Sequence, residues 1–285
     1  MRKITNIGAS NFRKLLHQAQ KNNLDFNTLL KRYLQERFLY RLSKSAYKDN
    51  FILKGGLLLI TIDIPASRPT MDIDLLTHKL DEAKVTEAFK EILVIEYPDG
   101  VTFDSASVQS EPITKDGAYQ GTRLKFKAYF NGSRNDMSID LGLGDYVINP
   151  REITFPTILH EDSPILTAYS LETIIAEKLE AMAKLLYANS RMKDFFDVYQ
   201  LFTNHEIDRT LLAEAIVCTF KNRNTPYREH LALFSDAFAT DKIRNTWWSA
   251  FLKKIRWKEQ VDFSAVMKCI KENLQEYWNE EALGQ

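Results

Sequence analysis

The sequence has little that suits a secreted, membrane-spanning or disordered protein. It contains only two cysteines in 285 residues, which excludes a disulfide framework and predicts reduced thiols in a cytoplasmic protein. Glycine and proline are sparse, at ten and eight residues, and the longest nearly apolar stretch is 55–62. That stretch is too short to cross a membrane, and the N-terminus lacks a signal-peptide core. Hydrophobic residues still make up 45% of the chain, so we expect one large or two modest globular domains.

The chain has no net charge, with 38 basic and 38 acidic residues, but the charges are unevenly distributed. Residues 1–50 contain eleven Lys or Arg and three acidic residues, an excess of eight positive charges that the remainder balances. This excess predicts contact with an anionic partner such as RNA, through side chains that include Lys31, Arg32 and Arg37. The alternative is a solvated helical face.

Periodicity divides the chain into helical, mixed and helical segments, in that order. Helices are predicted over 9–22, 26–46 with Asp25 as the N-cap, 57–64, 81–94, 171–188, 192–203, 209–222, 241–256 and 262–278. Strands are predicted over 71–76, 101–108, 122–130, 137–143 and 152–159, with a hairpin turn at Asn131-Gly132. The chain is therefore predicted to be α+β. Two domains are expected: 1–165 with the helical arm and a mixed sheet, and 166–285 with a helical bundle.

Two carboxylates alternate along a predicted strand. In 71–76, Asp72 and Asp74 share one face because successive side chains on a strand point to opposite faces. Such carboxylates repel each other unless a cation lies between them, and oxygen ligands suit Mg²⁺ or Mn²⁺ better than zinc. Asp140 is presented similarly on the predicted 137–143 strand and would join them if the two strands are neighbours. A solvated strand face is the alternative.

A glycine pair precedes these acids. In Lys54-Gly55-Gly56 the glycines allow backbone N–H groups to approach a phosphate, and the start of a helix adds a favourable dipole. An ordinary tight turn could have the same sequence.

One lysine lies in an apolar helix face. Lys178 falls in the middle of the apolar stripe of the predicted 171–188 helix, where a charge is costly unless it meets an anion. Asp194 and Asp197, one turn apart on the next predicted helix, could hold it. Because Lys178→Met removes this desolvation cost, we expect the variant to fold at least as stably as the wild type and yet to lose activity. Snorkelling of the side chain to solvent is the alternative.

Four segments together resemble the AbiEii toxin family of nucleotidyltransferases, within the DNA polymerase β-like superfamily. They are LKGGLLL (53–59), RPTMDIDLL (68–76), ETIIAEKLEAM (172–182) and RMKDFFDVYQL (191–201). The resemblance implies a polymerase β-like core followed by a helical bundle. The catalytic residues that it implies are Asp72, Asp74, Asp140, Lys178, Asp194 and Asp197, the first three also being metal ligands. The nucleotide-binding residues that it implies are Lys54, Gly55, Gly56, Arg68, Thr70 and Lys178.

The sequence departs from the wider superfamily at the glycine turn. Superfamily members often have Gly-Ser before the acidic pair, whereas this chain has Gly55-Gly56, with fifteen residues between the glycines and Asp72. No serine hydroxyl is available there to bind a phosphate, so backbone amides must take that role.

The resemblance also implies a function. It indicates a toxin of a bacterial toxin–antitoxin or abortive-infection (phage-defence) system that transfers a nucleotide from an NTP to RNA, for some members the 3′ end of tRNA. Its partners would be the NTP, the RNA and a cognate antitoxin encoded nearby, with Mg²⁺ or Mn²⁺ as cofactor. Two other classes stay open: a nucleotidyltransferase of small molecules such as antibiotics, and a non-catalytic nucleotide-binding or interaction protein. The basic 1–50 segment favours RNA over a small molecule.

Overall fold

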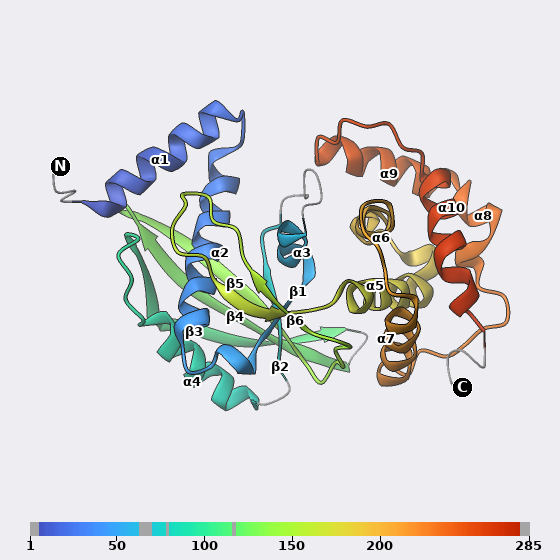
Figure 1. Cartoon of the computed structure of the whole chain (residues 1–285), viewed down its shortest axis with the longest axis horizontal. Coiled ribbons are helices and arrows are strands. Elements are labelled where there is room, and N and C mark those ends of the chain that lie inside the picture. The colour runs from blue at the N-terminus through green and yellow to red at the C-terminus, as the bar shows by residue number, and fades with distance from the viewer. Residues whose placement is uncertain (1–5, 63–69, 78–79, 116–117, 280–285) are drawn as a thin grey trace. The chain divides into compact units, whose positions relative to one another are not determined.

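The structure, a computed structural model, describes residues 6–62, 70–77, 80–115 and 118–279. Contacts divide the chain into two compact units (Figure 1). Unit 1 consists of the described residues up to Gly144 and of Arg151–Ala168. Unit 2 consists of Asp145–Pro150 and the described residues from Tyr169 onward.

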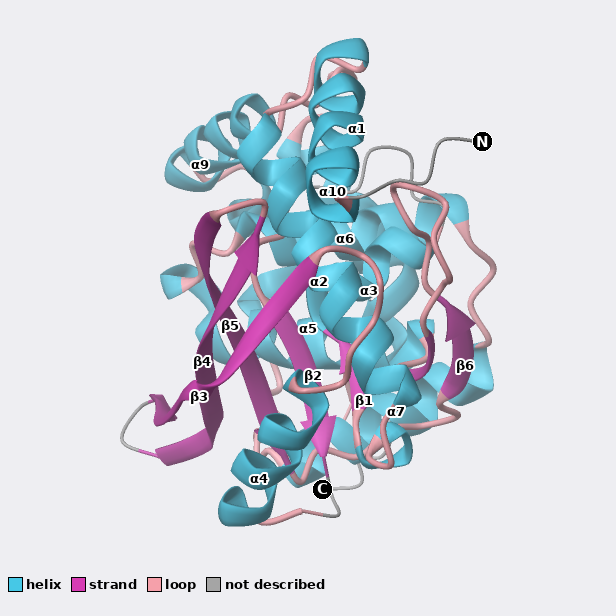
Figure 2. Ribbon diagram, turned by 90° about the vertical axis from the view of Figure 1, so that its left-hand side faces the viewer, coloured by secondary structure: helices cyan, strands magenta, loops and turns pink. Residues whose placement is uncertain are grey.

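Unit 1 is built on a mixed sheet with seven strands among the described residues (Figure 2). The strands are β1 (Ile52–Lys54), β2 (Ile73–Thr77), β3 (Val101–Lys115), β4 (Ala118–Phe130), β5 (Ser133–Leu143), β6 (Arg151–Thr154) and β7 (Ile165–Ala168). Their spatial order is β3-β4-β5-β2-β1-β7-β6. Strand β2 runs parallel to β5 and β1 parallel to β7, while the other neighbours are antiparallel. Strand β2, which carries one of the predicted site acids, therefore lies at the centre of the sheet.

The helices of unit 1 cover one face of this sheet. They are α1 (Ile7–Lys21), α2 (Phe26–Lys44), the short α3 (Gly55–Leu58) and α4 (Glu82–Leu93). Asp25 caps α2 as predicted, since its carboxylate accepts the backbone N–H of Thr28 at 2.8 Å. Phe38 of α2 packs on the rings of Phe89 in α4 and Phe126 in β4, with ring centroids 5.6 and 5.7 Å away. The apolar side chains of the strands thus point to α2 and α4, and the polar ones point to the opposite face.

The hairpin prediction is confirmed, but two short strands, β1 and β7, were not predicted. Asn131 and Gly132 both have positive φ, and Phe130 pairs with Ser133 directly across the turn. Strand β7 was not predicted because its four residues are too few for a periodic pattern. The strand predicted over 152–159 is shorter than expected, and β6 ends at Thr154.

The basic residues of segment 1–50 fasten α2 within unit 1. Arg37 has no exposed surface, and its Nη1 atom lies 3.0 Å from Glu161 Oε2. Arg41 is also buried and pairs with Asp99 at 2.8 Å. Arg32 lies over an aromatic ring, with its guanidinium carbon 4.3 Å from the centroid. The prediction that Arg37 contacts RNA is therefore wrong, because Arg37 is buried and pairs with an acid of unit 1. Arg32 is likewise engaged inside unit 1, by its contact with the aromatic ring.

Unit 2 is helical apart from its loops within the described residues. Its helices are α5 (Leu171–Leu185), α6 (Met192–Asn204), α7 (Arg209–Asn222), α8 (Asp236–Ala239), α9 (Lys242–Lys254) and α10 (Phe263–Leu274). Five of them match predicted helices to within a few residues, whereas the four-residue α8 was not predicted. Rings from α6, α8 and α10 form an aromatic core in which Phe195 and Phe263 lie 5.3 Å apart. The α+β prediction is confirmed.

Membrane insertion through a helix has no support in the part of the chain that the structure describes. None of its helices combines the length and apolarity needed to cross a bilayer.

Candidate active site

A row of charged side chains crosses one face of the sheet in unit 1. The strand register pairs Lys54 with Asp74, Asp74 with Asp140, Asp140 with Arg123, and Arg123 with Glu111. Paired residues on neighbouring strands point to the same face, so the five side chains form one line across β1, β2, β5, β4 and β3. The strand that carries Asp140 does lie beside the strand that carries Asp74, the condition on which the predicted acidic cluster depended.

The glycine turn closes against Asp74. Gly55 has φ +70°, and a Cβ at this position would overlap the Asp74 carboxylate. Only glycine therefore lets the backbone pass this close to the acid. The side chain of Lys54 extends from β1 across β2 towards β5. A Cβ placed on Gly142 of β5 would lie 3.4 Å from Lys54 Nζ. The ammonium group of Lys54 thus reaches past β2 to the neighbouring strand.

Asp140 is held by an arginine that the sequence analysis did not select. Arg123 Nε and Nη2 donate to Asp140 Oδ1 and Oδ2 at 2.6 and 2.7 Å, a bidentate pair. The hydrogen bonds to Asp140 raise the pKa of Arg123 above its usual value, against the effect of burial. The signal was present in the sequence, because a two-residue turn at Asn131-Gly132 fixes the hairpin register and places position 123 opposite 140.

Asp72 lies just before β2 and is exposed. Its Oδ1 atom accepts the hydroxyl hydrogen of Ser138 on β5 at 3.0 Å, so Asp72 lies beside β5 as well. Thr70 is half-exposed two residues earlier, and Arg68 lies outside the described residues. Burial lowers the pKa of Lys31 in α2, and the negative charge of Asp72 opposes that shift. Asp72 thus lies close enough to α2 to interact with Lys31.

The side chains that could bind a metal here are the carboxylates of Asp72, Asp74 and Asp140. Carboxylate oxygens suit Mg²⁺ rather than a metal that prefers thiol or imidazole ligands. Among the described residues, no group of three or more His, Cys, Asp or Glu side chains could hold a metal by itself. Magnesium usually completes its shell with water and substrate phosphates, so one or two carboxylates can be enough. The residues fit such a site, and the assignment of Asp72, Asp74 and Asp140 as metal ligands stays a prediction.

Lys178 lies in an ion cluster of unit 2. Its Nζ atom donates to Asp194 Oδ1 at 2.9 Å and to Asp197 Oδ2 at 2.7 Å, and both aspartates are 1% exposed. Arg191 Nε lies 2.8 Å from the other oxygen of Asp194. Burial alone would raise the pKa of Asp194, but Lys178 and Arg191 outweigh it and lower that pKa below its usual value. The expected contact between Lys178 and the next helix is present, and both acids take part in it.

This cluster reverses the expected effect of Lys178→Met on stability. The expectation of equal or higher stability assumed that the lysine adds only desolvation cost. In the structure Lys178 instead neutralises two buried carboxylates, so its removal leaves buried negative charge without compensation. The substitution should therefore destabilise unit 2.

A second ion cluster in unit 2 centres on Arg223, which sequence reasoning also missed. Its guanidinium lies 3.0 Å from Asp145, 2.9 Å from Glu177 and 3.0 Å from Glu180. Thr225 donates to Glu180 as well, at 2.5 Å. The two glutamates come from the family-like segment 172–182, so these acids secure α5 to the end of α7. Nothing in local periodicity connects positions more than 40 residues apart.

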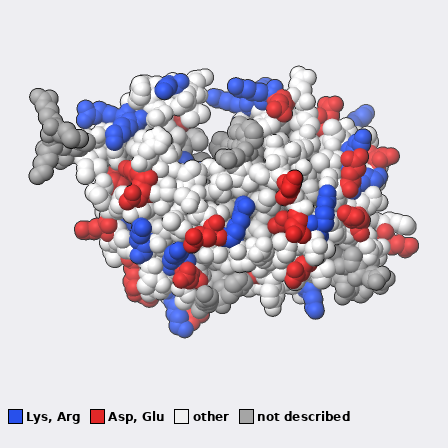
Figure 3. Space-filling view, viewed as in Figure 1, with Lys and Arg blue, Asp and Glu red and all other residues white. Residues whose placement is uncertain are grey.

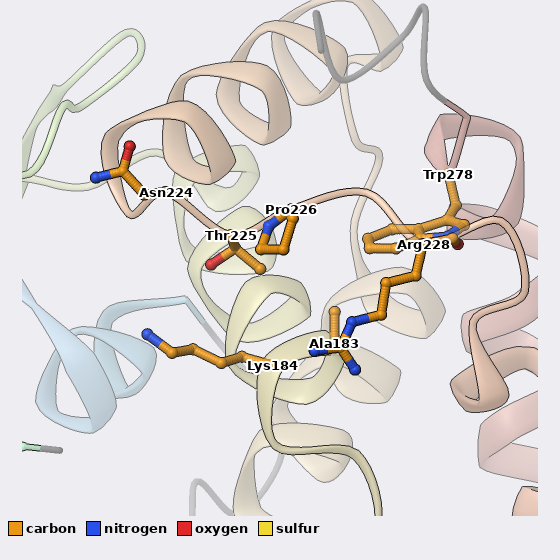
Figure 4. A pocket seen from close by; sticks show the side chains of 7 residues that line it. All are labelled: Ala183, Lys184, Asn224, Thr225, Pro226, Arg228 and Trp278. Carbon is orange, nitrogen blue, oxygen red and sulfur yellow. The ribbon is translucent and has the colours of Figure 1, made fainter.

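Unit 2 also contains a small pocket, shown in Figure 4. It has a volume of about 140 Å³ and is lined by Ala183, Lys184, Asn224, Thr225, Pro226, Arg228 and Trp278. Ligand sites for drug-sized molecules span roughly 300–1,000 Å³, so this pocket is too small to enclose a nucleoside triphosphate. The charged row of unit 1 is the better candidate for nucleotide chemistry.

Comparison with known proteins identifies the family of the chain. The model of the family described as "Nucleotidyl transferase AbiEii toxin, Type IV TA system" matches residues 37–268, well over half of the chain. The chain belongs to the AbiEii family. The matched range includes Asp74, Asp140 and Lys178 together with their partners, so the AbiEii match covers both units. The enzyme class is accordingly nucleotidyltransferase, and the system is a type IV toxin–antitoxin pair.

The solved structure of JHP933 shows the same fold at low sequence identity. JHP933 from Helicobacter pylori has a TM-score of 0.54 and 16% identity, over 92% of this chain and 95% of that chain. An antigenic nucleotidyltransferase-like protein from Paracoccidioides brasiliensis has a TM-score of 0.41 and 14% identity, over 82% of this chain and 91% of that chain. No curated protein matches the chain significantly.

Proposed function

We propose that this member of the AbiEii family is a Mg²⁺-dependent toxin that transfers a nucleotide from an NTP to RNA in the cytoplasm, with the 3′ end of tRNA as acceptor. The observation that carries the proposal is the side-by-side placement of Asp74 and Asp140 on β2 and β5, flanked by Lys54 and the Gly55 backbone. Phosphoryl transfer needs carboxylates that bind a metal ion and a cation that binds the phosphates, and these side chains lie next to one another on neighbouring strands.

Asp72 and Asp74 hold the Mg²⁺ in this proposal, with Asp140 as a third oxygen donor. Bound there, the ion would neutralise the triphosphate and stabilise charge on the attacking and leaving oxygens. Lys54 lies in the same row and supplies a compact positive charge for a phosphate oxygen. The triphosphate thus meets cations from the protein as well as from the metal.

In the transfer step the acceptor hydroxyl oxygen of the RNA forms a bond to the α-phosphorus. The bond from that phosphorus to the bridging oxygen breaks, and pyrophosphate leaves. Asp140 accepts the proton of the hydroxyl, and its bidentate contact with Arg123 fixes the direction in which its carboxylate points. Asp140 thus has two roles in the proposal, as a metal ligand and as a general base.

Unit 2 contributes Lys178 to the proposal. Two buried aspartates fix its ammonium group, so it is ordered before any substrate arrives. Lys178 is kept in the proposal as a nucleotide-binding residue of unit 2, and Asp194 and Asp197 position its ammonium group.

The proposal is tested by incubating the purified protein with labelled NTPs and total RNA, in Mg²⁺ or in EDTA. Asp74→Asn should reduce transfer on the order of 10²-fold or more, since charge stabilisation worth several kcal/mol is lost. Asp136→Asn is the matched control, because Asp136 is an exposed carboxylate on β5 outside the row. Sequencing of tRNA 3′ ends identifies the acceptor. Full activity of Asp74→Asn or in EDTA contradicts the metal assignment, and label found only on a small molecule contradicts the RNA acceptor.

A further inference from the structure

Helix α9 and the turn after it are unusually basic. Residues 242–258 contain six Lys or Arg and no Asp or Glu. Four of the cations are clustered at the C-terminal end: Lys253, Lys254, Arg256 and Lys258, here called the α9 basic cluster, and all four are exposed. In Figure 3, Lys and Arg side chains gather along the upper edge of the molecule over the end of α9. The charge is thus concentrated on a short surface segment.

The cluster has no ion-pair partner within the described part of the chain. None of its four members forms a salt bridge to a described acid. Arg244, on the same helix, is different, because it is buried and pairs with Asp241, the N-cap residue of α9. Cations in the last turn of a helix are favoured by its dipole, which explains Lys253 and Lys254. Arg256 and Lys258 lie beyond the helix end and need another explanation.

The backbone at Arg256 gives an independent argument. The turn after α9 is a Schellman motif, in which Trp257 N–H donates to Leu252 O at 3.0 Å and Arg256 has φ +55°. Two other helices of the chain end in the same motif, and at the corresponding left-handed position they have Asn23 and Asn224. Asparagine tolerates this conformation and glycine prefers it, whereas arginine is disfavoured. The chain therefore keeps a strained cation where an uncharged residue would fold more easily.

The turn is rigidly held. Trp257 packs edge-on against Phe196 of α6, with ring centroids 4.9 Å apart, and Phe196 belongs to the core of unit 2. Lys258 and Arg256 lie on either side of this anchor. The cations are thus presented from a fixed point on the surface, which lowers the entropy lost when they bind a ligand.

We propose that the α9 basic cluster binds the phosphate backbone of the RNA acceptor. This inference rests on the proposed RNA-directed function and assigns the acceptor a docking surface in unit 2. Exposed cations without partners suit a phosphate backbone because they release its counterions on binding. The contact is independent of base sequence, so it positions the RNA while other residues select the nucleotide.

The test is RNA binding without nucleotide transfer, measured with total tRNA by fluorescence anisotropy over a range of KCl concentrations. Arg256→Gly should weaken binding roughly three- to fivefold at 0.15 M salt and reduce the slope of log K against log[KCl] by about 0.7–0.9, the loss of one phosphate contact. Glycine is preferred at this position, so Arg256→Gly should also melt at or above the wild-type temperature. Asn23→Gly, at the equivalent position after α1, relieves the same backbone conformation without removing a charge and should bind tRNA like the wild type.

A triple variant, Lys254→Ala, Arg256→Gly and Lys258→Ala, should lose about two to three phosphate contacts. The slope of log K against log[KCl] should become smaller by the corresponding amount. If wild-type protein binds tRNA with a salt-dependent affinity and the triple variant binds equally well, the docking surface is wrong while the RNA-directed function stands. If wild-type protein does not bind RNA, both fail. If the triple variant keeps its RNA affinity but loses binding to the antitoxin, the cluster is a protein-binding surface and the inference is overturned.

Discussion

Gly55 has a left-handed backbone, and a Cβ added at this position would overlap the carboxylate of Asp74. Two separate penalties would follow from adding a side chain here. One is the positive φ, which disfavours any residue with a Cβ, and the other is the overlap with Asp74. The second penalty concerns the site directly, because the carboxylate must move to make room.

We therefore expect Gly55→Ala to reduce both stability and nucleotide transfer. The backbone penalty alone is about 1 kcal/mol, and displacement of Asp74 should reduce transfer by at least about tenfold. Gly132 is the matched control, because it has φ +78° and a Cβ added there would meet no atom within 4 Å. Gly132→Ala should therefore lose similar stability and keep its activity. Thermal melting and the transfer assay on both variants decide, and unchanged transfer by Gly55→Ala would mean that the turn has no role in the site.

At the scale of the helices, Lys178 of α5 stabilises unit 2 because its ammonium group neutralises two buried carboxylates of α6. Lys178→Met should lower the free energy of unfolding by about 3–5 kcal/mol, because Asp194 and Asp197 stay buried without their ammonium partner. Lys184, further along α5, is exposed, and Lys184→Met should change stability by less than about 0.5 kcal/mol. Urea unfolding of the two variants tests this.

The role of Lys178 in nucleotide binding needs a separate variant that restores stability. Combining Lys178→Met with Asp194→Asn and Asp197→Asn removes the buried charges together, which is often nearly neutral for folding. If this triple variant folds like the wild type and still binds NTP normally, Lys178 is a structural residue only.

Sequence reasoning succeeded at this scale where the signal was local. Helical periodicity located Lys178 on the apolar stripe and the two aspartates on the next helix. The alternating pattern located Asp74 on a strand, whereas Asp72 lies just before that strand. It failed where the partner lies far away in sequence. The excess charge of segment 1–50 was assigned to RNA although Arg37 pairs with Glu161 inside unit 1. Composition counts charges but does not show which of them are already neutralised by distant residues.

For the whole molecule, the balanced charge removes long-range repulsion as a cause of pH dependence near neutrality. Individual buried groups should then set the response, and the two units contain groups with opposite shifts. Burial raises the pKa of Glu36 in unit 1 to about 7, while Arg32 and Arg37 act in the other direction. In unit 2 the pKa of Asp194 is lowered by Lys178 and Arg191 despite burial.

The sign follows for each unit. Folded unit 1 keeps the proton of Glu36 between about pH 4.5 and 7, where the unfolded chain has lost it, so stability falls as the pH rises through this window. The stabilisation from ionised Asp194 is complete above the usual carboxyl pKa and disappears as the pH falls through the lowered folded value. Mild acid should thus stabilise unit 1 through Glu36, whereas stronger acid, below about pH 4, should destabilise unit 2.

Glu36→Gln should therefore remove a pH-dependent loss of stability that amounts to about 3 kcal/mol between pH 4.5 and pH 8, since each pKa unit corresponds to about 1.4 kcal/mol. Glutamine keeps an oxygen acceptor for the backbone N–H of Ile158, which Glu36 binds at 3.0 Å, so the local structure is preserved. Asp194→Asn serves as the contrasting variant, because it should leave the pH 4.5–8 profile unchanged and alter only the acid limb. Thermal melts of both variants and the wild type across pH 3–8 provide the measurement. An unaltered slope between pH 4.5 and 7 in Glu36→Gln would show that the buried carboxylate is already ionised, and that Arg32 and Arg37 fully offset its burial.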